Sequence, residues 1–117
     1  MDPRFHFDSL AHDNSALHSE VLSTNILCET QKDTPAPIML EGFQTVAKFN
    51  RQTPDRVTIL MALYRIESKD TDLVVTFNVP LQSEDGGAVD EAGLVQIKQE
   101  FETFARSLGI VDYGLFA

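Results

Sequence analysis

The sequence predicts an α+β protein in which an antiparallel β-sheet is flanked by helices. Consecutive segments between residues 38 and 80 show the alternation and the β-branched and aromatic composition that are typical of strands. The polar links between these segments are short, so neighbouring strands should run antiparallel. A long amphipathic helix follows the strands, and its apolar side must cover one face of the sheet because it cannot remain in water.

A short helix is predicted over residues 3–14. Asp2 is a typical N-cap residue, and proline suits the first helical position, which Pro3 would occupy. Apolar residues recur from Phe7 onward at spacings of three and four, as on one face of a helix. Phe5 and Phe7 also alternate, so a short strand is the competing interpretation of this segment.

Two long strands are expected next, over His18–Glu29 and Ile38–Asn50. The segment Thr30–Pro37 separates them and is rich in turn-forming residues, among them two prolines. Gly42 interrupts the second strand. A glycine at such a position indicates a β-bulge or a close approach of another part of the chain. A turn at Asn50–Asp55 then leads into the next strand.

The segment Arg56–Ile66 is apolar on both faces, as expected of a central strand that is covered on both sides. The short polar link Glu67–Asp70 should return the chain antiparallel to it. The strand that follows shows the clearest alternation in the chain, and it should end at Pro80 because proline cannot donate to a sheet. The residues expected to face the core are Leu73, Val75, Phe77 and Val79, with Val74, Thr76 and Asn78 on the other face.

The last predicted element is a helix over residues 91–108. A surface loop at Gln82–Val89 precedes it, Asp90 is a suitable N-cap, and Gly109 is a suitable stop. The apolar stripe of this helix, with spacings of three and four, consists of Leu94, Ile97, Phe101, Phe104 and Leu108. The tail Ile110–Ala117 is too apolar to remain in water and should dock against the body of the protein.

The composition indicates one acidic domain over residues 1–117. Eighteen acidic residues against nine basic residues give a net charge of −9. Such a charge repels phosphate backbones and anionic lipid, so neither a nucleic-acid partner nor a membrane partner is expected. It favours encounter with a basic protein surface, although it would equally serve solubility alone. Cys28 is the only cysteine, so no intrachain disulfide can form.

The sequence contains no pattern typical of a catalytic, cofactor-binding or metal-binding site. His6 and His12 are about 240° apart around a helix, and no further ligands are spaced to complete a metal site with Asp8. Phosphate-binding glycine loops and nucleophile elbows are also absent from the sequence. We therefore expect no cofactor and no metal. A small-molecule cavity behind Phe77 and Phe101 stays open as a further hypothesis.

Several segments together resemble a known protein family. The matching segments are Val46–Asn50 (VAKFN), Ala62–Ile66 (ALYRI) and Thr71–Val75 (TDLVV), flanked by Phe5–Phe7 with Leu10 and by Ile110–Asp112 with Leu115–Ala117. In these segments the chain resembles the Ran guanine-nucleotide release factors, the Mog family of nuclear-import proteins, whose fold is like that of the photosystem PsbP proteins. The resemblance extends over nearly the whole chain and implies a PsbP-like α/β/α sandwich.

The same resemblance implies a function. Members of this family bind the small GTPase Ran and promote release of its guanine nucleotide during nuclear protein import, which implies a location in the nucleus and the cytoplasm. A protein of this kind is a binding module and not an enzyme. The alternative is an acidic adaptor or scaffold that binds a protein through its sheet edge and releases no nucleotide.

The chain departs from the family pattern at its beginning. Family members start with a block that carries a glycine-rich first strand and the acidic residues implicated in gripping Ran, and this block has no counterpart here. The fold is therefore expected to be incomplete at its N-terminus, with an unpaired sheet edge through which copies of the chain can associate. We also expect weaker Ran binding than a longer relative would show.

Five polar residues are the candidates for a partner-binding surface. They are Asp8, Asp13 and Asn14 on the first helix, and Lys48 and Asn50 at the end of the second strand. For Lys48 and Asn50 the competing interpretation is structural, since polar groups at strand ends often satisfy a turn.

Overall fold

The computed structural model describes residues 2–27, 34–47, 54–82 and 88–110. The elements, in chain order, are α1 (Pro3–Asp13), β1 (Ala16–Ile26), β2 (Ile38–Val46), β3 (Asp55–Ile66), the 3-10 turn η1 (Glu67–Lys69), β4 (Thr71–Gln82) and α2 (Glu91–Ser107). The four strands form one antiparallel sheet in the order β1-β2-β3-β4. Each strand thus lies beside the strand that precedes or follows it in the sequence.

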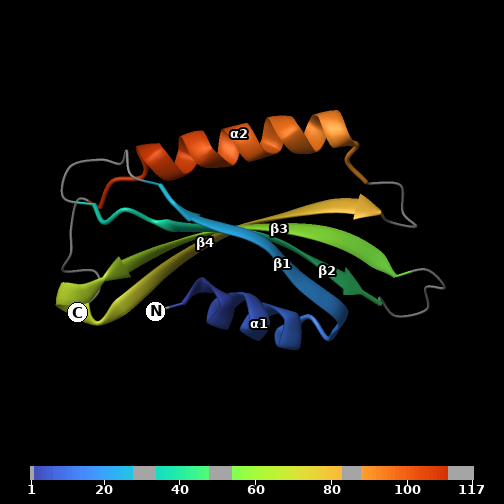
Figure 1. Ribbon diagram of the computed structural model, residues 1–117, viewed down its shortest axis with the longest axis horizontal. Coiled ribbons are helices and arrows are strands. Elements are labelled where there is room, and N and C mark those ends of the chain that lie inside the picture. The colour runs from blue at the N-terminus through green and yellow to red at the C-terminus, as the bar shows by residue number, and fades with distance from the viewer. Residues whose placement is uncertain (1, 28–33, 48–53, 83–87, 111–117) are drawn as a thin grey trace.

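The two helices lie on opposite faces of this sheet (Figure 1). Helix α1 contacts β1, β2 and β3 on one face, and α2 lies over the other face, where it contacts β3. A helix on each face of an antiparallel sheet makes an α/β/α sandwich, and the predicted α+β class is confirmed. Within the described residues, no helix is long and apolar enough to cross a membrane.

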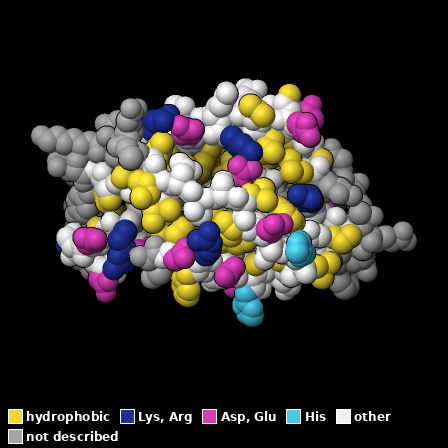
Figure 2. Space-filling model, viewed as in Figure 1, with side chains coloured by type: hydrophobic (Ala, Val, Ile, Leu, Met, Phe, Trp, Pro, Cys, Tyr) yellow, Lys and Arg dark blue, Asp and Glu magenta, His cyan; other side chains and the backbone are white. Residues whose placement is uncertain are grey.

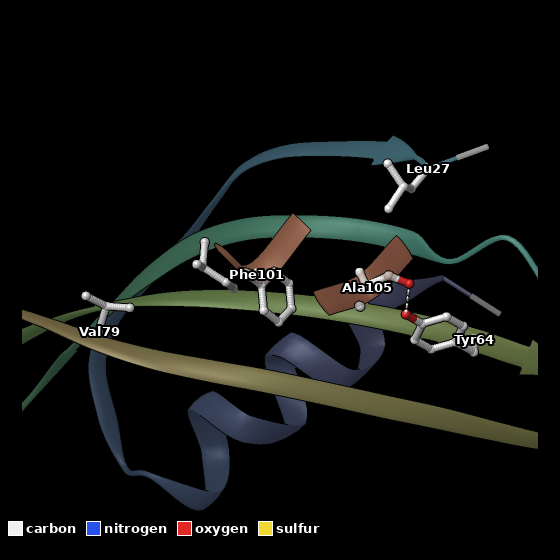
Figure 3. Close-up of a cluster of buried hydrophobic side chains, with 7 residues drawn as sticks. Leu27, Tyr64, Val79, Phe101 and Ala105 are labelled. Carbon is white, nitrogen blue, oxygen red and sulfur yellow. Dashed lines mark hydrogen bonds between the residues drawn. The ribbon is translucent and has the colours of Figure 1, made fainter. Parts of the chain in front are cut away.

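Strand β3 contributes side chains to a hydrophobic core on each side of the sheet. Leu60, Ala62 and Tyr64 belong to the core beneath α2, whereas Ile59 and Met61 pack with α1. All five side chains are less than 5% exposed, as the prediction of a doubly covered central strand requires. The core beneath α2 is completed by Leu27, Val79, Phe101 and Ala105 (Figure 3).

Both helices begin where their capping residues predict. The Asp2 side chain accepts a hydrogen bond of 2.9 Å from the main-chain nitrogen of Arg4 at the start of α1. Asp90 accepts one of 2.7 Å from Gly93 at the start of α2. These bonds satisfy main-chain donors that the first turn of a helix leaves without partners. Helix α2 ends at Ser107, one residue before the predicted end.

The prediction that Pro80 ends the last strand is wrong. Strand β4 continues through Pro80 to Gln82, with Pro80 opposite Val57 and an irregularity in the register immediately afterwards. Because β4 lies at an edge of the sheet, a residue without an N–H can be accommodated there. The carbonyl oxygen of Pro80 accepts a hydrogen bond of 2.7 Å from the Val89 nitrogen and so holds the chain that leads into α2.

The prediction that Phe104 lies within the buried stripe of α2 is only partly confirmed. Phe101 is 3% exposed, but Phe104 is 39% exposed, and its ring centroid lies 6.0 Å from that of Phe77. Ala105, which the stripe omitted, is fully buried. The helix therefore presents the Phe101 and Ala105 side to the sheet. Of the tail Ile110–Ala117, which is predicted to dock against the body, only Ile110 is described, and its main-chain nitrogen donates a hydrogen bond of 3.1 Å to Oγ1 of Thr34. Residues 111–117 lie outside the described residues.

Gly42 shows both features that the sequence predicts. A Cβ atom at this position would lie 2.6 Å from the Glu20 carbonyl oxygen and 2.7 Å from Cε1 of Phe7, so only glycine fits without displacement. The irregularity lies in the partner strand: Val21 pairs with Gly42 and Ser23 pairs with Glu41, which leaves Leu22 as the extra residue of a bulge. The missing side chain lets the ring of Phe7 reach the sheet.

Candidate protein-binding surface

Helix α1 is fixed to the sheet by one buried ring and one buried amide. Phe7 is 1% exposed and belongs to the core on this face. Gln44, fully buried on β2, donates from Nε2 to the carbonyl oxygen of Phe7 at 3.3 Å and accepts at Oε1 from Nδ2 of Asn14 at 3.1 Å. Asn14, a predicted partner-binding residue, thus uses its amide to close the end of α1 onto β2.

Asp8 and Asp13, also predicted to bind a partner, are both exposed but do not share a surface. They are five residues apart, which places them about 140° apart around a helix. Asp13 lines a shallow pocket together with His6 and with Met61 and Val74 of the sheet, so it lies on the flank of α1 that faces β3 and β4. Asp8 lies on a different flank of the helix.

Lys48 and Asn50 lie outside the described residues. Strand β2, which leads towards them, ends at Val46. Their part in a binding surface therefore stays a prediction.

A cluster of charged residues that sequence reasoning missed joins α1 to the β3–β4 hairpin. Nε2 of His6 lies 3.0 Å from Oδ2 of Asp72, and Arg65 donates to the other oxygen of Asp72 at 2.9 Å. Arg65 also pairs with the exposed Asp70. The Asp72 side chain is only 8% exposed, so this carboxylate is taken out of water with two partners.

The surroundings of Asp72 act on its pKa in opposite directions. Burial alone would raise the pKa of Asp72. Hydrogen bonds from His6 and Arg65, and the charge of Arg65, outweigh the burial and hold the pKa below its ordinary value. At neutral pH Asp72 is therefore a carboxylate that holds α1 to the hairpin.

Only part of this cluster has a signal in the sequence. Arg65 and Asp72 are directly opposite each other in the β3–β4 pair, so a correct hairpin register would have paired them. His6 is 66 residues away from Asp72 in sequence, and nothing in the sequence connects them.

The described residues contain no group of three or more His, Cys, Asp and Glu side chains placed to hold a metal ion. The rings of Phe77 and Phe101 meet edge to face at 4.6 Å between centroids, so a packed seam lies where a small-molecule cavity was hypothesised. The exposed residues of both helices include polar and charged side chains, such as Asp8 and Asp13 of α1 and Glu100 and Glu102 of α2.

Sequence comparisons identify the known proteins that this chain is similar to. The family described as Ran-interacting Mog1 protein matches residues 2–80, which run from the N-cap of α1 to Pro80 of β4. A Ran guanine nucleotide release factor of Danio rerio is 26% identical over 124 residues, covering 97% of this chain and 67% of the relative. A probable Ran guanine nucleotide release factor of Dictyostelium discoideum is 30% identical over 127 residues, covering 97% of this chain and 65% of the relative.

The chain spans about two thirds of the length of the curated relatives that it matches. No solved structure matches it. The family match covers more than half of the chain and includes α1 and nearly the whole sheet. The chain belongs to the Ran-interacting Mog1 protein family.

Proposed function

We propose that this chain binds the small GTPase Ran and promotes release of its guanine nucleotide during nuclear protein import. The observation that carries the proposal is the family match over residues 2–80, which comprises α1 and nearly the whole sheet. The names of both curated relatives support the same activity. Because the chain spans about two thirds of those relatives, their activity is a proposal for this chain and not a property read from it.

The proposed mechanism requires that the chain bind nucleotide-free Ran and nucleotide-loaded Ran with different affinities. It does not require that any covalent bond be made or broken. A protein that binds nucleotide-free Ran more tightly than nucleotide-loaded Ran must weaken the binding of the nucleotide by the same factor. Such a protein needs a surface whose contacts with the two states of Ran differ in free energy. Contacts of Phe7, Gln44 and Asp72 hold α1, which carries candidate contact residues, against the sheet. The chain thus acts as a binding module and not as an enzyme.

The contact with Ran is proposed to involve the exposed acidic side chains of α1. Asp8 and Asp13 are available because both are exposed, and Lys48 and Asn50 remain candidates from the sequence. The side chain of Asn14 contributes indirectly, by closing α1 onto Gln44. A net charge of −9 would speed encounter with a basic surface of the partner.

The proposed activity implies a cellular location for the protein. Nuclear import connects the cytoplasm and the nucleus, so we propose that the chain occurs in both compartments. Imaging of a tagged chain in cells tests this directly, and exclusion from either compartment contradicts it.

A nucleotide-release assay tests the function. Ran is loaded with a fluorescent guanine nucleotide, excess unlabelled nucleotide is added, and the release rate is followed as the chain is titrated. We expect a saturable increase in rate, with the Danio rerio relative as positive control and a heat-unfolded sample as negative control.

The assay also separates the alternative function. Calorimetric titration of the chain into Ran measures binding without reference to nucleotide release. Binding without faster release would identify an acidic adaptor, and the release activity would be rejected. Absence of binding would reject Ran as the partner.

A further inference from the structure

A small pocket lies where one flank of α1 meets the β3–β4 hairpin. Its volume is about 180 Å³. This is below the range of roughly 300–1,000 Å³ that is usual for small-molecule sites, so the pocket suits a single side chain. The described residues that line it are His6, Ser9, Leu10 and Asp13 of α1, Met61 of β3, and Val74 and Thr76 of β4.

The pocket has an apolar interior and a polar rim. Met61 is only 1% exposed, and the partly buried Leu10 and Val74 pack against the same core. Asp13 and Thr76 are exposed. Lysine and arginine bury their carbon stems along apolar surface while they keep the charged group in water. The pocket therefore offers both kinds of surface that a long cationic side chain uses.

The carboxylate of Asp13 is available to such a side chain. Within the described part of the chain, no ion pair involves Asp13, although Figure 2 shows acidic and basic side chains mixed over the face that it presents. His6 is the basic residue among those that line the pocket, and it is engaged by Asp72. In the pocket beside α2, by contrast, Glu41 and Glu102 are already paired with Lys98 and Arg106.

Asp13 also stands at an unfavourable place in the helix. It is the last residue of α1. The C-terminal end of a helix carries partial negative charge, so a carboxylate there costs free energy and a cation is favoured. His12 is the basic residue of the same turn, and it forms no ion pair with Asp13 within the described residues. A residue that breaks a local rule without compensation inside the fold is typical of a functional site.

We propose that this pocket binds one lysine or arginine side chain of Ran. The carbon stem lies against Leu10, Met61 and Val74, and the charged group lies near the Asp13 carboxylate and the carbonyl end of α1. The inference rests on the proposed function and names one contact within it. It selects Asp13 over Asp8, which does not line the pocket.

Neutralising Asp13 tests the charged part of the contact. Asp13→Asn and Glu91→Gln each remove one negative charge from an exposed position, the second on the helix that covers the opposite face of the sheet. In calorimetric titrations with Ran, we expect Asp13→Asn to weaken binding about fivefold or more and Glu91→Gln to change it less than about twofold. The unfolding temperature of Asp13→Asn should not fall, because a charge at the wrong end of a helix is removed. A merely structural role of Asp13 would lower stability and binding together.

Filling the pocket tests its apolar part. Thr76→Leu places a larger side chain at the rim, whereas Asn78→Leu makes a similar change two residues further along β4, at an exposed position that does not line the pocket. We expect Thr76→Leu to weaken Ran binding about fivefold or more and Asn78→Leu to change it less than about twofold.

The results separate this inference from the proposed function. If the unmodified chain does not bind Ran, both are overturned. If it binds Ran and neither Asp13→Asn nor Thr76→Leu weakens the binding, the pocket is rejected and the proposed function stands. Equal losses in Asp13→Asn and Glu91→Gln would mean that only the net charge attracts Ran, which also rejects the pocket as the site.

Discussion

The hydroxyl of Tyr64 donates a hydrogen bond of 2.7 Å to the main-chain carbonyl oxygen of Ala105 (Figure 3). Both residues are fully buried, so this bond joins the central strand β3 to the last turn of α2 beneath the surface. The last carbonyl groups of a helix have no partner within the helix. Tyr64 satisfies one of them and holds the end of α2 against the sheet.

Removing this hydroxyl should destabilise the protein. We expect Tyr64→Phe to lower the free energy of unfolding by about 1–2 kcal/mol, since a buried carbonyl group loses its partner. Ser107→Ala is the matched control, because Ser107 also donates from a hydroxyl to a carbonyl oxygen of this turn, but at the exposed surface. Urea denaturation measures both, and equal losses would contradict a special role for the buried bond.

The same tyrosine should make stability sensitive to high pH. Burial raises the pKa of Tyr64 above its ordinary value of 10.0. The unfolded chain then loses this proton at a lower pH than the folded chain, so its stabilising effect is complete below about pH 10 and falls as the pH rises towards the folded pKa. Denaturation of Tyr64→Phe as a function of pH should lack this part of the decline. An identical alkaline profile in both proteins would show that Tyr64 does not titrate as expected.

The carboxylate of Asp72 should support α1 at neutral pH. We expect Asp72→Asn to lower the free energy of unfolding by about 1–2 kcal/mol, because His6 and Arg65 lose a charged hydrogen-bond acceptor. The loss for Asp70→Asn should be much smaller, since the Asp70 side chain is 92% exposed. Chemical denaturation at pH 7 compares the two, and a larger loss for Asp70→Asn would contradict the assignment.

The lowered pKa of Asp72 predicts that the free energy of unfolding decreases in acid. Its pKa is lowered in the folded protein, so its contribution is present above the ordinary value of 3.8 and is lost as the pH falls through the folded value. The acid limb of the stability profile should therefore be shallower in Asp72→Asn than in the unmodified chain. Parallel acid limbs would exclude Asp72 as a source of the decline.

The space at Gly42 should be more restrictive than that at Gly93. We expect Gly42→Ala to cost about 1–3 kcal/mol, because the new Cβ meets the main-chain oxygen of Glu20 at 2.6 Å and the ring of Phe7. In Gly93→Ala the nearest atom, also at 2.6 Å, is a terminal methyl of Val89, which can rotate away, and alanine favours the helix. Thermal unfolding of both variants checks this order, and a greater loss for Gly93→Ala would contradict it.

Reversing the charge of one acidic residue of α1 should slow nucleotide release from Ran more than reversing the charge of the other. Asp8 and Asp13 lie about 140° apart around the helix, so one flat contact surface includes only one of them. We expect either Asp8→Lys or Asp13→Lys, but not both, to lower the nucleotide-release rate more than threefold while leaving the unfolding temperature unchanged. Equal effects of the two variants, or none, would argue against α1 as part of the Ran contact.

Much of the fold could be predicted because the signals are local. The apolar run of β3, the alternation of β4, and the caps at Asp2 and Asp90 depend on residues a few positions apart, and the structure confirms them. Pro80 shows where a local rule fails. Proline disfavours a central strand but not an edge strand, and only the order of strands reveals that β4 is an edge.

The candidate surface was less predictable because its members are brought together from distant segments. The helical spacing alone separates Asp8 from Asp13, yet only the fold shows that Asn14 is engaged by Gln44 and that His6 meets Asp72. The sequence by itself determined the class of fold, the acidic charge and the family, since these reside in composition, periodicity and motif. The tertiary structure alone decided the order of the strands in the described sheet and which polar groups are held inside, because packing across the sheet joins residues that no spacing along the chain connects.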